Sequence, residues 1–188
     1  MNGAPFTALL AGLLLSSPLA ALGYIPTSAL AATERPRHAW PYAVYGACAI
    51  LLFALCAWPL HLVLLAAGIA WPELPLDILA LWGVNRALRA LTGRSAVLQA
   101  QSPFFALNCA VLGAGLAAVE RYPHDWYPAL LFAAGMAVGF PAAVIVIAHC
   151  RERIETGRFS PRLAGWPSLL LLCACCCVAC QGLALLLR

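Results

Sequence analysis

Long apolar runs separated by short polar stretches extend along the whole chain. They cover approximately residues 1–24, 40–65, 74–91, 103–119, 129–148 and 166–187. An α-helix needs about 20 mostly apolar residues to cross a hydrocarbon layer of about 30 Å, and most of these runs approach that length. The pattern therefore predicts six transmembrane helices. Asn85, Arg86 and Arg89 crowd the end of the third run, so a re-entrant segment is also possible there.

Composition supports the same class of protein. Hydrophobic residues make up 64% of the 188 residues and charged residues only 10%, whereas soluble domains carry about 25% charged residues. We therefore expect one integral membrane domain over residues 1–188, surrounded by the lipid bilayer. All eleven basic residues are arginine, and their distribution suits loops between helices better than a surface for nucleic acid.

The arginines also predict how the helices are oriented. Nine of the eleven fall in or beside the first, third and fifth predicted loops, and the exceptions are Arg121 and Arg188. Arginine-rich loops stay in the cytoplasm, so both termini of this multi-pass protein are expected on the outer side of the membrane. The first apolar run is read as a retained helix because no basic residue precedes it, unlike in a secretory signal peptide.

Two of the predicted helices are interrupted, and they occupy equivalent places in the chain. Ser16-Ser17-Pro18 breaks the first helix, and Asn108-Cys109 places polar atoms inside the fourth. Six helices then divide into a repeat over about residues 5–92 and another over about 103–187. An odd number of helices per repeat makes the repeats inverted, an arrangement typical of transporters with discontinuous helices. The predicted fold is thus all-α, with two inverted three-helix repeats.

Cysteine chemistry is the main candidate for a functional site. An amide such as that of Asn108 needs a hydrogen-bond partner in apolar surroundings. Cys109 could be a small packing residue or a ligand for a soft centre such as an iron–sulfur cluster. The run with Cys173, Cys176, Cys177 and Cys180 could in principle bind metal, but packing is the simpler interpretation. Packing is also expected of Cys48 and Cys56.

Several short motifs resemble one protein family in their order along the chain. They are Leu22-Gly23-x-x-Pro26, Cys56-Ala57-Trp58, Pro103 with Asn108-Cys109-Ala110-Val111-Leu112-Gly113, Ala137-Val138-Gly139-Phe140 and Arg151-Glu152-Arg153. Over about residues 10–185 the chain resembles the RnfA/NqrE family. Its members are membrane subunits of two complexes: RnfA of the Rnf ion-translocating oxidoreductase, and NqrE of the sodium-translocating NADH:quinone oxidoreductase.

The resemblance implies a partner and a cofactor. In this family a homologous six-helix subunit of opposite topology pairs with the protein, and each contributes two cysteines to a 2Fe–2S cluster within the membrane. Cys109 matches one ligand, with Asn108 beside it, but the other ligand position holds Ile25. Isoleucine cannot bind iron, so the ligand set is incomplete and we expect the cluster to be absent or altered.

Three functions remain open on the sequence alone. The first is a divergent membrane subunit of an Rnf/Nqr-type complex that couples electron transport to ion translocation; it would not be catalytic alone. The second is a structural subunit of such a complex that has lost the cluster. The third is a small inverted-repeat solute transporter, for which Ser16, Ser17 and Asn108 are the few polar candidates in the apolar runs.

Overall fold

The protein is all-helical throughout the part that the computed structural model describes. That part comprises residues 4–15, 36–68, 73–93, 96–99 and 108–156, together with positions 167, 170–172, 174, 175, 178, 179 and 182. Its helices are α1 (Ala4–Leu15), α3 (Pro36–Ala67), α4 (Glu73–Leu91), α5 (Ala96–Gln99), α7 (Cys109–Arg121) and α8 (Trp126–Thr156).

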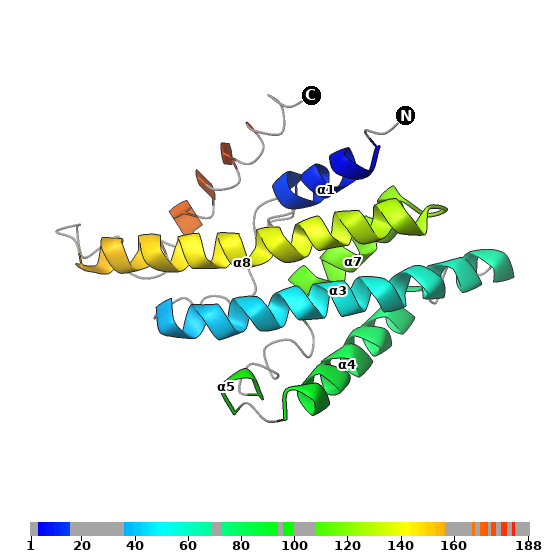
Figure 1. Cartoon of the computed structure of the whole chain (residues 1–188), viewed down its shortest axis with the longest axis horizontal. Coiled ribbons are helices and arrows are strands. Elements are labelled where there is room, and N and C mark those ends of the chain that lie inside the picture. Colours follow the sequence, from blue (N-terminus) through cyan, green and yellow to red (C-terminus); the bar gives the residue numbers. More distant parts are fainter. Residues whose placement is uncertain are drawn as a thin grey trace.

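Two long helices, α3 and α8, form the centre of the arrangement and run antiparallel beside each other (Figure 1). Helix α1 packs on α8, and α4 packs on α3. The shorter α7 contacts both long helices and begins part-way along them rather than at an end. This placement brings the start of α7 into the interior of the described part of the bundle.

Glycines allow α1 and α8 to approach through their backbones. A Cβ atom on Gly12 would overlap the carbonyl oxygen of Phe132, and one on Gly135 would overlap that of Leu9. A Cβ on Gly139 would lie 3.0 Å from the carbonyl oxygen of Leu13. Gly135 and Gly139, four residues apart on one face of α8, thus allow its close packing against α1.

Aromatic side chains fill the space that other glycines leave open. Phe140 of α8 occupies the position where a side chain on Gly46 of α3 would stand. Phe53 of α3 lies in the same way against Gly115 of α7. Both phenylalanines are fully buried. Each ring thus packs between two helices, in a space that any side chain at the glycine position would occupy.

The hydropathy pattern located the long helices but misplaced some of their ends. Two described stretches are long and apolar enough to cross a membrane, Ala39–Ala67 and Trp126–Ile154. The charged stretch 151–155, expected as a loop, is helical because α8 continues to Thr156. Likewise, α3 already begins at Pro36 inside the expected polar loop, and proline suits the first position of a helix.

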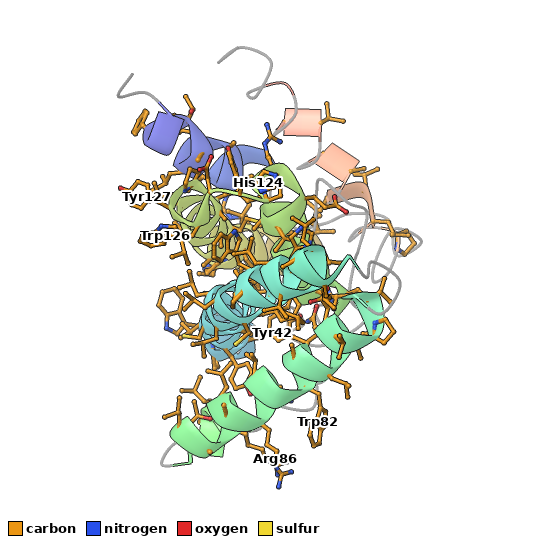
Figure 2. The ribbon with its side chains drawn as sticks, turned by 90° about the vertical axis from the view of Figure 1, so that its right-hand side faces the viewer. Tyr42, Trp82, Arg86, His124, Trp126 and Tyr127 are labelled. Atoms are coloured by element: carbon orange, nitrogen blue, oxygen red, sulfur yellow. The ribbon has the colours of Figure 1, made fainter. Side chains whose placement is uncertain are left out.

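Helix α4 is a regular helix, and the face that it packs against α3 carries both apolar and polar side chains. Leu81, Val84 and Leu88 are buried on that helix, and so are the polar residues Asp77 and Asn85. The hydroxyl of Tyr45 in α3 donates to Oδ1 of Asn85 at 2.7 Å. On the outer side Arg86 lies over the ring of Trp82, 5.7 Å from its centroid, and both project away from the bundle (Figure 2).

Several predicted features fall outside the described residues. They are the break at Ser16-Ser17-Pro18, the ligand position Ile25, and four cysteines of the final run, Cys173, Cys176, Cys177 and Cys180.

Candidate functional site

Asn108 and Cys109 stand at the start of α7, not in the interior of a helix as the sequence suggested. Asn108 is the N-cap, with extended backbone angles (φ −89°, ψ 110°), and its Oδ1 accepts a hydrogen bond from the backbone N–H of Ala110 at 2.9 Å. An N-cap side chain satisfies one of the backbone donors that a helix start leaves without a partner. The capping role therefore explains why an asparagine occupies position 108.

The other end of the Asn108 amide reaches across to α3. Its Nδ2 donates to the hydroxyl of Tyr42, with 3.4 Å between the two atoms. Asn108 is 2% exposed and Tyr42 fully buried, so this contact lies away from water. The amide thus has partners for both its oxygen and its nitrogen, as its burial requires.

Tyr42 is a part of the site that sequence reasoning missed, because an aromatic near the end of an apolar run is typical of a membrane interface. Its ring lies 6.0 Å from that of Phe140 in α8, at an interplanar angle of 39°. Trp126 and Tyr127 instead project outward, and both are more than half exposed (Figure 2). The sequence signal that could have found Tyr42 was weak, because 66 residues separate it from Asn108.

Helix α3 also holds the far end of α7. Tyr122 is the C-cap of α7, and its carbonyl oxygen accepts a hydrogen bond from Nε1 of Trp58 at 3.3 Å. Near this end an apolar cavity of about 200 Å³ lies between α3, α7 and α8, with Trp58 and Trp126 among its lining residues. Helix α7 is thus attached to α3 at both of its ends.

Cys109 is exposed, although both of its neighbours in the chain are buried. As the first residue of α7 it stands at the positive end of the helix dipole, where anionic groups are stabilised. A thiol placed this way can meet a second protein or a lipid. Cys48 and Cys56 of α3 are exposed as well, so the expectation that they serve as buried packing residues was wrong.

The structure describes Cys109, one of the two positions at which the resemblance places iron–sulfur ligands, whereas Ile25 lies outside the described residues. A 2Fe–2S centre normally has four cysteine ligands. Among the described residues, no three histidine, cysteine, aspartate or glutamate side chains gather closely enough to hold a metal ion. Cys109 is exposed, as a ligand shared with a second subunit would need to be.

Comparison with known proteins identifies the family. A family model described as "Rnf-Nqr subunit, membrane protein" matches residues 92–187, which include α7 and α8. An RnfA protein of the Na(+)-translocating ferredoxin:NAD(+) oxidoreductase complex of Acetobacterium woodii is 32% identical over 80 residues, 43% of this chain and 41% of the relative. Its counterpart in the ion-translocating oxidoreductase complex of Aromatoleum aromaticum is 31% identical over 82 residues, 44% of this chain and 42% of the relative.

A third relative belongs to the other branch of the same family. The NqrE protein of the Na(+)-translocating NADH-quinone reductase of Chromohalobacter salexigens is 35% identical over 63 residues, 34% of this chain and 30% of the relative. The matched stretches span less than half the length of these relatives. The family model nevertheless covers half of the chain and confirms the resemblance carried by the sequence motifs, so the chain belongs to the Rnf-Nqr family of membrane subunits, at modest identity to RnfA and NqrE proteins.

Proposed function

We propose that the protein is a membrane subunit of an Rnf/Nqr-type complex that couples electron transfer to ion translocation across a bacterial inner membrane. The observation that carries the proposal is the family match over residues 92–187, which contains the Asn108-Cys109 start of α7. The three relatives are named as subunits of ion-translocating or Na(+)-translocating oxidoreductases. Because a single subunit of such a complex does not react alone, its partners are the other subunits and the lipid bilayer.

The proposed fold has six spans in two inverted repeats, over about residues 5–92 and 103–187, with both termini on the periplasmic side. Helices α3 and α8 support it, because they have 32 and 31 residues and run antiparallel. Each carries a similar group of residues in its first turns, Trp40-Pro41-Tyr42-Ala43 in α3 and Trp126-Tyr127-Pro128-Ala129 in α8. Equivalent segments at opposite ends of antiparallel helices are what inverted repeats produce.

A homologous six-helix subunit of opposite topology is the proposed direct partner. In the resembled family that pair shares a 2Fe–2S cluster, which would carry electrons across the middle of the membrane. This chain would offer Cys109, whose thiol is exposed, whereas Ile25 occupies the second position. We therefore propose that the pair holds little or no cluster unless replacement ligands complete the set.

A structural subunit without a cluster is the second candidate, and one observation favours it. Asn108 caps α7 and contacts Tyr42, and neither interaction needs iron. The same observation weakens the solute-transporter hypothesis, because the amide of Asn108 is already engaged between helices. Whether Cys109 matters for electron transfer separates the two remaining candidates.

Deletion and complementation in the bacterium that carries the chain test the proposal. Inverted membrane vesicles are assayed for oxidation of NADH or reduced ferredoxin and for the accompanying uptake of sodium or protons. We expect deletion to abolish the coupled activity, the wild-type chain to restore it, and a homologous six-helix protein to co-purify. Unchanged activity after deletion together with purification as a lone monomer would refute the proposal. Full restoration by Cys109→Ser would select the structural candidate.

A further inference from the structure

We propose that Tyr42 is a positioning residue for Cys109, acting through the N-cap Asn108. The inference rests on the proposed function in one respect, that Cys109 is the chemically important group of the chain. It goes beyond that function by assigning the placement of the thiol to a residue of another helix. Three features support it: the contact between Tyr42 and Asn108, the fixation of Tyr42 itself, and the separate attachment of the rest of α7.

The contact joins α3 to the residue directly before Cys109. Asn108 Oδ1 binds the backbone N–H of Ala110, and Nδ2 binds the Tyr42 hydroxyl at 3.4 Å. Both side chains are buried, with exposed fractions of 2% for Asn108 and 0% for Tyr42. Water cannot readily replace a hydrogen bond lost there, so its loss weakens the hold of α3 on the cap residue. A less firmly held cap changes the first turn of α7.

Tyr42 can serve as a fixed point because its ring is held from a third helix. The ring of Phe140 in α8 packs against it, and Phe140 itself occupies the space that Gly46 leaves open on α3. The tight packing of α3 against α8 therefore fixes the position of the Tyr42 hydroxyl. The direction in which α7 leaves this unit sets where the sulfur of Cys109 stands outside the core.

The remainder of α7 has its own attachments. Trp58 binds the C-cap residue Tyr122, and Phe53 packs into the space beside Gly115. Loss of the Tyr42 contact should therefore release the first turn of α7 and leave the rest of the helix in place. This makes the predicted effect local to Cys109.

The chain offers a matched control one helical turn further along α3. Tyr45 is 1% exposed, and its hydroxyl donates to Asn85 Oδ1 at 2.7 Å. Asn85 belongs to α4, not to α7. Tyr45→Phe thus removes a hydroxyl of nearly equal burial whose bond to Asn85 lies outside α7.

The test measures how fast N-ethylmaleimide alkylates Cys109 in membranes that contain the full chain. Mass spectrometry of the digested protein gives the rate at Cys109 relative to the exposed Cys48. We expect Tyr42→Phe to change this ratio by about threefold or more, the factor that a net hydrogen bond commonly represents. Tyr45→Phe should leave it within about twofold of wild type, since its lost bond of similar strength lies elsewhere.

A second variant removes the contact from the other side. Asn108→Ser retains a capping hydroxyl, but the shorter side chain cannot reach Tyr42. It should shift the ratio in the same direction as Tyr42→Phe, and the double variant should show no further shift, because the two residues act through one contact. Non-additivity of this kind would not arise from general loosening of the protein.

The inference is overturned if Tyr42→Phe leaves the ratio unchanged, if Tyr45→Phe changes it equally, or if Cys109 resists alkylation in every variant. The assay reads the position of the thiol and does not depend on electron transfer. A shifted ratio combined with full activity of Cys109→Ser would support the positioning role of Tyr42 while refuting a redox role for Cys109. The two proposals can therefore fail separately.

Discussion

The packing of α1 against α8 gives a sharp stability prediction for Gly135→Ala. The new Cβ would overlap the carbonyl oxygen of Leu9 and lie 2.8 Å from the backbone nitrogen of Leu13 and 3.0 Å from the carbonyl carbon of Gly12. All three are backbone atoms, so no side chain can rotate away and the helices must separate.

Two opposing effects determine the size of the change. Overpacking of a close contact typically costs about 1–3 kcal/mol, while alanine is a better helix former than glycine by about 0.8–1.0 kcal/mol. We expect a net loss of up to about 2 kcal/mol in the free energy of unfolding, with the clash outweighing the helix preference. Gly139→Ala should cost less, because the nearest atom to its Cβ, the carbonyl oxygen of Leu13, lies at 3.0 Å.

Gly83→Ala in α4 is the matched control. A Cβ at Gly83 meets no atom of the described residues within 4 Å, so the helix preference dominates and the variant should gain up to about 1 kcal/mol. Unfolding by sodium dodecyl sulfate in mild detergent micelles, followed by tryptophan fluorescence, measures both variants. A Gly135→Ala protein as stable as the wild type would refute this reasoning, and so would stability changes in the same direction for the two variants.

Three further predictions concern the cap, the topology and the cluster. In iron-free protein, Asn108→Ala should lower the free energy of unfolding by about 1 kcal/mol through the lost cap, whereas Cys109→Ala should change it by less than about 0.5 kcal/mol; equal losses in the same unfolding assay would contradict this. A reporter fused after Arg188 should be active only if it works outside the cytoplasm, and cytoplasmic activity would reverse the assigned topology. Iron and sulfide analysis with EPR should find little or no cluster in the purified pair, unless Ile25→Cys restores the missing ligand; a near-stoichiometric signal that Cys109→Ala removes would show that the ligand set was misjudged.

Hydropathy located the long helices well because burial in lipid demands long apolar runs. The expected helix at 40–65 lies within α3, and the one at 129–148 lies within α8. Their ends were missed for a physical reason: hydropathy reports transfer into the bilayer, while a helix can continue into water. The charged turns 151–155 remain helical because backbone hydrogen bonds do not require apolar side chains.

The site was predicted only where a local signal existed. An amide within an apolar run is costly enough to single out Asn108 from sequence alone, and asparagine before a helix start is a known capping signal. The interruption was expected inside a helix, so that capping role was overlooked. Tyr42 carried no local signal, since an aromatic near the end of an apolar run is typical of a membrane interface. Only the packing of α3 against α7 and α8 reveals that it is buried.

The two residues of the Asn108-Cys109 pair therefore support different kinds of conclusion. The burial, cap geometry and Tyr42 contact of Asn108 explain its presence by packing alone, so a protein of this family that had lost its cluster would still require it. Cys109 is exposed and has no such packing explanation. Evidence for electron transfer must come from the thiol. The buried contacts of Asn108 would be the same whether the protein carries electrons or serves only as a structural component. Experiments that disturb those contacts cannot distinguish the two functions, whereas Cys109→Ser, which leaves them intact, can.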